Sequence, residues 1–154
     1  MEIQQALMLA TITGKVSPCA KSKRGVVIFH PDKTDFYSAN NSPPYPFYCN
    51  GSAECIAACG NVAVHAEQRA IGLALQRENL SEGWQMVHAK VVNGELVAGG
   101  QPSCIQCSKI ILECGITKMW LYCNLTEGPT LVSYDPVTFH EISLVNSRLP
   151  VIRE

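Results

Sequence analysis

The sequence predicts an α/β protein, a three-layer α/β/α sandwich built around a mixed central sheet. Segments with apolar residues at helical spacing alternate along the chain with short runs of β-branched and aromatic residues. Their order is helix, two strands, helix, strand, helix, two strands and helix, an alternation typical of a sheet covered by helices. With 154 residues, 47% hydrophobic and 16% charged, the chain is long enough to bury a core, and we expect one domain over residues 1–154.

The first half of the chain opens with a helix and a pair of strands. An apolar stripe at helical spacing runs from the N-terminus and ends near Gly14. Residues 25–29, Gly-Val-Val-Ile-Phe, read as a buried strand, and residues 35–38 return as a second strand. Residues 44–65 are predicted to form a long irregular loop. The next helix opens at His65 and is apolar on several faces, which predicts a central position.

The second half is predicted to hold strands at residues 84–92, 95–98, 118–122 and 130–134, and helices opening at Cys104 and covering residues 136–148. Asn93-Gly94 is a strong signal for a two-residue hairpin turn. Gly115 is the expected C-terminal cap of the helix that opens at Cys104. His88 falls within the strand over residues 84–92 and is interpreted as an ordinary surface or packed residue.

Two short motifs carry the chemistry: His65-Ala66-Glu67, and Cys104-Ile105-Gln106-Cys107 after an intervening strand. One imidazole and two thiols are ligands that Zn²⁺ prefers, and three ligands leave a fourth tetrahedral position for water. Cys104 and Cys107, three residues apart, share one side of a helical first turn, where the helix dipole favours thiolates. Glu67 does not share a face with His65, so it is placed to carry protons and not to bind metal.

Together the motifs resemble those of the cytidine/deoxycytidylate deaminase superfamily, with Ser103 inserted between Pro102 and Cys104 where the family has proline directly before cysteine. The resemblance covers most of the chain up to the strand over residues 118–122 and implies the same layered fold. It also implies a zinc-dependent hydrolase that deaminates a ring at an amidine carbon. Glu67 would serve as general base and acid, and the backbone around Ala66 and Cys104 would position the reacting groups.

The substrate is less directly encoded. Asn40-Asn41-Ser42-Pro43-Pro44 resembles the Gly-Tyr-Asn-Gly-Pro loop of deoxycytidylate deaminases, in which the asparagine contacts sugar and base. This resemblance implies that Asn41 binds substrate and that dCMP is converted to dUMP with release of ammonia. The basic side chains that could bind the phosphate of the substrate are those of Lys21, Lys23, Arg24 or Arg148.

Four more cysteines suggest a second metal. Some deoxycytidylate deaminases carry a structural zinc before the catalytic helix, and Cys19, Cys49, Cys55 and Cys59 offer four thiolates for a closed tetrahedral site. The alternative is that these are four unrelated thiols.

Other functions remain open on the sequence alone. A free nucleoside or base deaminase needs the same metal site without a phosphate pocket, and an enzyme that edits RNA or DNA needs a single strand or a flipped base. A net charge of −1 and no evident basic, aromatic-lined surface disfavour nucleic acid. A non-catalytic zinc module would leave Glu67 unexplained. We expect a cytoplasmic protein without a membrane segment, and, as in the family, a homo-oligomer.

Overall fold

The computed structural model describes residues 1–99 and 102–153, and these contain one six-stranded mixed sheet. Its strands are β1 (Lys23–Phe29), β2 (Phe36–Asn40), β3 (Gln85–Val92), β4 (Glu95–Val97), β5 (Lys118–Leu125) and β6 (Gly128–Tyr134). The strand order is β2-β1-β3-β5-β6, with β4 paired to β3 through the Asn93-Gly94 hairpin. Only the β3–β5 pair is parallel. The predicted mixed sheet is therefore confirmed.

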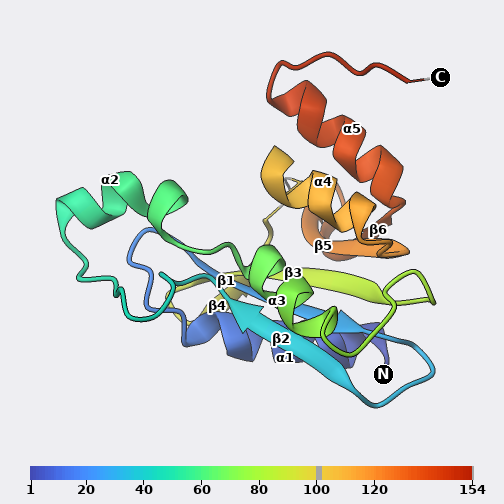
Figure 1. The fold of residues 1–154 in the computed structure, drawn as a ribbon, viewed down its shortest axis with the longest axis horizontal. Helices are drawn as coiled ribbons and strands as arrows, with labels where there is room; N and C mark the ends of the chain where they lie inside the picture. Colours follow the sequence, from blue (N-terminus) through green and yellow to red (C-terminus); the bar gives the residue numbers. More distant parts are fainter. Residues whose placement is uncertain (100–101, 154) are drawn as a thin grey trace.

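Helices cover both faces of this sheet, as the alternation of elements predicts (Figure 1). The helices of the described residues are α1 (Ile3–Lys15), α2 (Ala53–Val62), α3 (Ala66–Ala74), α4 (Ile105–Glu113) and α5 (Pro136–Asn146), and all but α2 belong to the layers that cover the sheet. One face is covered by α1, while α3 and α4 lie on the other and α5 packs against α4. The expected three-layer α/β/α arrangement is confirmed.

Two apolar cores result from the alternation of side chains along the central strands. Val26 and Ile28 of β1 face α3 and α4, and the intervening Val27 and Phe29 face α1. All four are at most 1% exposed, because β1 lies between two strands and under helices on both faces. This double burial explains why the strand reads as a continuous apolar run.

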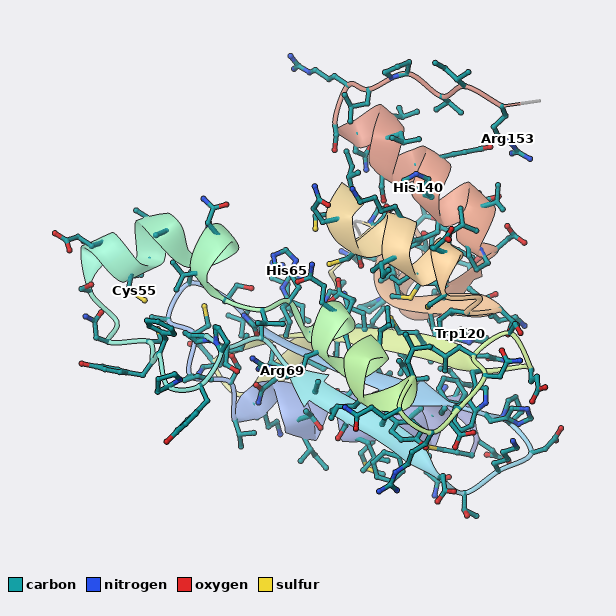
Figure 2. All side chains as sticks on the ribbon, viewed as in Figure 1. Cys55, His65, Arg69, Trp120, His140 and Arg153 are labelled. Atoms are coloured by element: carbon teal, nitrogen blue, oxygen red, sulfur yellow. The ribbon has the colours of Figure 1, made fainter. Side chains whose placement is uncertain are left out.

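The expectation of an irregular loop over residues 44–65 is wrong, because the segment contains α2. The Ser52 side chain caps this helix by accepting a hydrogen bond from the Cys55 amide at 3.1 Å. None of the residues of α2 is buried, and in Figures 1 and 2 the helix stands to one side of the sheet. Since α2 buries no apolar stripe, hydrophobic periodicity could not reveal it.

The connections between elements bring the starts of α3 and α4 together. α4 lies in the crossover between the parallel strands β3 and β5, and Sγ of Cys104, just before its first residue, lies 3.4 Å from Nδ1 of His65, the residue just before α3. Arg69 of α3 ties that helix to the end of β2, donating to the backbone carbonyls of Asn40 at 3.1 Å and Ser42 at 2.9 Å. Among the described residues no helix is long and apolar enough to cross a membrane.

Candidate active site

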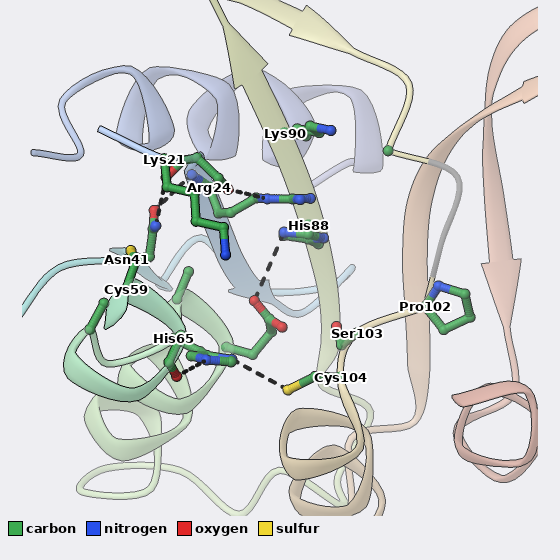
Figure 3. Close-up of a pocket in the computed structure, with 16 residues that line it drawn as sticks. Lys21, Arg24, Asn41, Cys59, His65, His88, Lys90, Pro102, Ser103 and Cys104 are labelled. Atoms are coloured by element: carbon green, nitrogen blue, oxygen red, sulfur yellow. Dashed lines mark hydrogen bonds and ion pairs between the residues drawn. The ribbon is translucent and has the colours of Figure 1, made fainter. Parts of the chain in front are cut away.

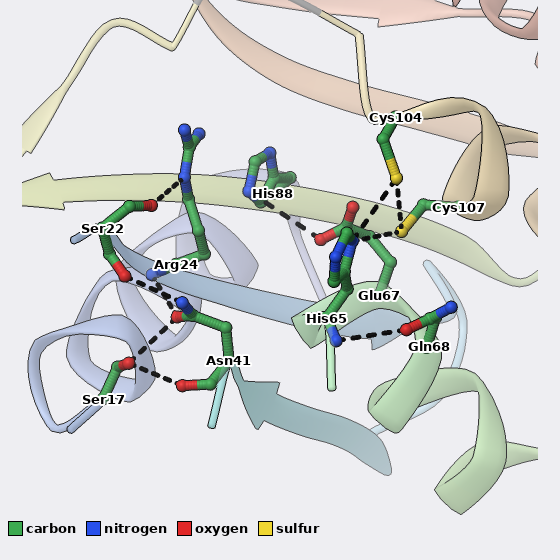
Figure 4. Close-up of polar contacts among 10 residues, drawn as sticks. All are labelled: Ser17, Ser22, Arg24, Asn41, His65, Glu67, Gln68, His88, Cys104 and Cys107. Carbon is green, nitrogen blue, oxygen red and sulfur yellow. Dashed lines mark hydrogen bonds and ion pairs between the residues drawn. The ribbon is translucent and has the colours of Figure 1, made fainter. Parts of the chain in front are cut away.

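His65, Cys104 and Cys107 converge as the motifs predict (Figure 4). The His65 Nδ1 atom lies 3.1 Å from Cys107 Sγ and 3.4 Å from Cys104 Sγ, and the two sulfurs are 3.5 Å apart. Tetrahedral zinc, with metal–sulfur bonds of about 2.3 Å, holds its ligand atoms roughly 3.5–3.8 Å apart. The observed triangle is slightly tighter, and its donor set is that of a zinc site, so these residues fit the metal.

Local backbone structure explains why the three ligands meet. His65 is the N-cap of α3 and Cys104 is the N-cap of α4, so both helices begin at the site. The His65 amide donates to Gln68 Oε1 at 3.2 Å, which closes the first turn of α3. The His65 Nε2 atom lies 3.4 Å from the Gly60 carbonyl, the kind of contact that orients a metal-binding imidazole through its other nitrogen.

The two thiols differ strongly in acidity. The side-chain hydrogen bond between Cys104 and Cys107, with a further contribution from His65, lowers the pKa of Cys104 to about 4 despite partial burial. The hydrogen bond with Cys104 raises the pKa of His65 to about 9, and the separate hydrogen bond between Cys107 and Cys104, together with burial, raises the pKa of Cys107. Cys104 is therefore a thiolate at neutral pH, the form in which cysteine binds a metal.

Glu67 lies beside the ligand triangle, in the first turn of α3. It is 5% exposed, and burial alone would favour its protonated form. His88, Ser103 and Cys107 outweigh that effect and lower the pKa of Glu67. The Ser103 hydroxyl, at the residue inserted relative to the family pattern, is close enough to contribute although it makes no hydrogen bond of standard geometry within the described residues.

His88 is the neighbour of Glu67 that the sequence did not reveal. Its Nε2 atom lies 3.9 Å from Glu67 Oε1, and the residue is 9% exposed. The interpretation of His88 as an ordinary strand residue is incomplete, since the residue is packed but also lines the cavity that contains Glu67 (Figure 3). Its polar side chain within an otherwise buried strand is the one signal that could have identified it.

A cavity of about 430 Å³ opens in front of these groups, large enough for a small ligand. Lys21, Arg24 and Lys90 line it, and Glu67 is the only carboxylate among its described lining residues. Strand pairing places two of these cationic residues side by side, because Arg24 on β1 is directly opposite Lys90 on β3. Burial lowers the pKa of Arg24, and no acidic side chain forms a salt bridge with it among the described residues.

The structure separates the predicted phosphate-binding residues into two groups. Lys21 and Arg24 line the cavity, and Lys90 joins them without having been predicted. The Lys23 ammonium donates instead to the Ser17 carbonyl, and Arg148 follows the C-terminus of α5 and does not line the cavity.

Asn41 and Ala66 also line the cavity, as expected of substrate-binding residues. The Asn41 amide is already engaged, however, since its Oδ1 accepts from the Arg24 amide at 2.8 Å and its Nδ2 donates to the Ser22 carbonyl at 2.8 Å. Ala66 stands in the first turn of α3, where helical amides have no intrahelical acceptor and remain available to a ligand.

The four remaining candidate ligands form two pairs. Cys19 Sγ is 2.6 Å from Cys59 Sγ, and Cys49 Sγ is 3.2 Å from Cys55 Sγ. Among the described residues only His65, Cys104 and Cys107 form a cluster whose ligand atoms all lie within 4.8 Å of one another. Burial, and then the hydrogen bond with Cys19, raises the pKa of Cys59 to about 11. The four thiols therefore lie as two pairs, and a second zinc at these cysteines stays a prediction.

Comparison with known proteins identifies solved structures of similar fold. The chain matches neither a protein-family model nor a curated protein sequence. Among solved structures it is similar to dCMP deaminase from the cyanophage S-TIM5 in apo form, with 20% identity, a TM-score of 0.57, and coverage of 77% of this chain and 82% of that one. The same phage enzyme in complex with dCMP and dUMP gives 19% identity, a TM-score of 0.56, and coverage of 77% and 81%.

Cytidine deaminase from Burkholderia pseudomallei is similar over a longer part of the chain, with 14% identity, a TM-score of 0.61, and coverage of 90% of this chain and 96% of that one. The expected resemblance of fold is therefore confirmed: the chain shares the fold of these two deaminases. Its candidate metal ligands and Glu67 stand at the starts of α3 and α4, where the motifs predicted them.

Proposed function

We propose that this protein is a zinc-dependent hydrolase that deaminates a cytosine nucleotide, dCMP first among them, with release of ammonia. One observation carries this proposal: His65 and Cys104 line the same cavity as the buried carboxylate of Glu67, and the buried Cys107 completes their ligand triangle. A zinc ion held there supplies Lewis acidity and a water that ionises near neutral pH. A purely structural zinc site would be expected to have a fourth protein ligand and no reason to bury Glu67 beside it.

The chain's own groups have separate tasks in this proposal. Glu67, ionised at neutral pH, accepts a proton from water and returns protons to N3 of the ring and to the departing amine. His65 and the two cysteines fix the metal beside that carboxylate. The free first-turn amide of Ala66 donates to the polar edge of the substrate.

The charges around the cavity support a nucleotide over a free nucleoside or base. Lys21, Arg24 and Lys90 outnumber the single carboxylate among the described lining residues. A cationic cavity favours an anionic ligand, and a nucleoside or base would leave these charges without a partner. The partly buried Arg24 suits a phosphate best, because guanidinium binds phosphate oxygens through paired hydrogen bonds.

A second candidate function is deamination of a base within a single-stranded nucleic acid. It is favoured by Tyr45, Phe47 and Tyr48, which are 98%, 70% and 79% exposed in the segment before α2. Exposed aromatic rings are the usual stacking platforms for unpaired bases. The sequence alone had given no such surface.

Ammonia release by the zinc-loaded protein tests these functions. The screen compares dCMP, CMP, deoxycytidine, cytosine, AMP, GMP and a cytosine-containing single-stranded oligonucleotide. We expect the highest kcat/KM for dCMP, and turnover of the oligonucleotide alone would establish the second candidate instead. The matched control is Glu67→Gln, which keeps the size of the side chain and should lower kcat about 10²–10⁴-fold while the zinc content stays unchanged. Full activity in Glu67→Gln would refute its assigned role.

We also propose a structural zinc at Cys19, Cys49, Cys55 and Cys59, which would draw the two thiol pairs into one site and stabilise α2. Elemental analysis of the fully reduced protein tests it, with two zinc ions per chain expected and one in Cys55→Ser. One zinc in the wild type refutes the second site.

A homo-oligomer is part of the proposal, because α2 buries none of its residues within one chain. Size-exclusion chromatography with light scattering should give a mass above that of the 16.8 kDa chain. A monomer across the micromolar range would refute it.

A further inference from the structure

His88 presents a buried polar atom that nothing in the described part of the chain satisfies. Its Nε2 atom makes no hydrogen bond there, and the residue is 9% exposed. Buried polar groups are nearly always paired, so an atom without a protein partner in a cavity wall is available to a ligand. His88 lines the same cavity as Glu67 and two of the candidate metal ligands, His65 and Cys104 (Figure 3).

The strand fixes the direction of the imidazole. Side chains alternate along β3, so that Val87 and Ala89 pack toward α1 while Met86 packs in the core beneath α3 and α4. His88 and Lys90 continue the row begun by Met86 and both reach the cavity. The imidazole is thus held by backbone pairing and not by a flexible loop.

The distance between His88 and Glu67 suits one small ring between them. The two side chains point toward one another (Figure 4), and at 3.9 Å Nε2 and Oε1 are too far apart for a direct hydrogen bond but close enough for two neighbouring polar atoms of one ligand to contact both. In cytosine, N3 and the 2-carbonyl oxygen are separated by a single ring carbon. When Glu67 addresses N3, the next polar atom along that edge is this carbonyl oxygen.

The protonation state of His88 agrees with a donor at Nε2. Burial lowers the pKa of His88, and the charges of Arg24 on β1 and Lys90 on β3 lower it further, while Glu67 on α3 opposes them. The ring is therefore neutral at pH 7 and carries one proton, which can reside on Nε2. A carbonyl oxygen accepts that proton, whereas adenine presents only C–H at the corresponding position and guanine an amino donor.

We propose that His88 is a specificity-determining residue that donates a hydrogen bond from Nε2 to the 2-carbonyl oxygen of the substrate's pyrimidine ring. This inference rests on the proposed function and deepens it, since it makes a 2-oxopyrimidine the required substrate class. It assigns a role to a side chain that lies outside both sequence motifs.

Paired substrates and paired variants test the proposal. Deamination of dCMP is compared with that of its 2-thio analogue, whose sulfur is a weak acceptor, and loss of this bond should lower wild-type kcat/KM roughly 10- to 100-fold. His88→Phe removes the hydrogen-bond donor, and His88→Asn places it on a shorter side chain. Both variants should lower kcat/KM for dCMP and bring the ratio of kcat/KM between dCMP and its 2-thio analogue close to one. His88→Gln, which places an N–H at a similar reach, should keep most of the preference. Met86→Leu on the same face of β3 is the control and should keep both rates.

The outcomes separate the possible failures. A wild-type ratio retained in His88→Phe or His88→Asn overturns the proposal. Equal slowing of both substrates with a shifted pH–rate profile also overturns it, because His88 would then act through Glu67. No ammonia from any cytosine compound with the zinc-loaded wild type overturns the proposed function itself, and the role of His88 with it. A second measurement, the Kd of dUMP against that of 2-thio-dUMP, should show the same preference without turnover.

Discussion

Asn41→Ala is expected to destabilise the fold and weaken substrate binding together. The Asn41 side chain, 8% exposed, links the end of β2 to the backbone at Ser22 and Arg24 through two hydrogen bonds of 2.8 Å. Ser17 Oγ also lies 3.0 Å from Oδ1, but it reaches the Asn41 carbonyl at 2.6 Å and keeps that partner after truncation. Two bonds are therefore lost, and the Arg24 amide and Ser22 carbonyl lose their partners.

The size of the effect follows from those two bonds. Each contributes about 0.5–1.5 kcal/mol, and a buried group left without a partner costs about 1–3 kcal/mol unless water replaces it. Because the cavity admits water to part of this region, we expect a loss of roughly 2–4 kcal/mol in the free energy of unfolding. For a chain of this length about 1 kcal/mol corresponds to 2–4 °C, so Tm should fall by roughly 4–16 °C.

Urea and thermal unfolding of the zinc-loaded protein measure this loss. Asn40→Ala is the matched control, because the neighbouring Asn40 makes a single side-chain hydrogen bond, 3.2 Å to the Thr13 carbonyl, and should cost about 1 kcal/mol or less. Unlike this control, Asn41→Ala also removes the hydrogen bonds that hold the segment carrying Lys21 and Arg24. The KM for dCMP should therefore rise in Asn41→Ala. Equal stabilities of the two variants would refute the structural role, and an unchanged Tm with a raised KM would make Asn41 a direct substrate contact only.

Three further variants test other parts of the molecule. Cys104→Ala should lose the zinc bound at the catalytic site and all deaminase activity, and elemental analysis showing full zinc in an active variant would contradict the ligand assignment. Arg24→Met should raise KM for dCMP about tenfold or more while leaving KM for deoxycytidine nearly unchanged, and an equal rise for both would argue against a phosphate contact. Gly25→Ala should lower soluble expression and Tm sharply, because its Cβ would lie 1.9 Å from the Ala10 carbonyl oxygen of α1; a wild-type melting curve would contradict this close approach.

Local sequence was enough to predict the layers of the fold and the residues of the candidate metal site. The apolar runs gave the sheet, and the spacing of His65, Glu67, Cys104 and Cys107 placed four functional side chains on two helix starts, because residues two or three apart in a first turn have fixed relative positions. The nature of the ligands then indicated zinc. These inferences needed neighbouring residues, the resemblance of the two motifs to those of the deaminases, and one long-range assumption, that the two helices meet.

The tertiary structure decided everything that depends on which strands pair and in which register. Arg24 and Lys90 share the cavity because β1 and β3 are antiparallel neighbours, and His88 reaches Glu67 because of its alternation along β3. A shift of one residue in that pairing would turn these side chains toward α1. Sequence also missed α2, which has no buried face. Register and burial are set by contacts between distant segments, and a one-dimensional pattern does not contain them.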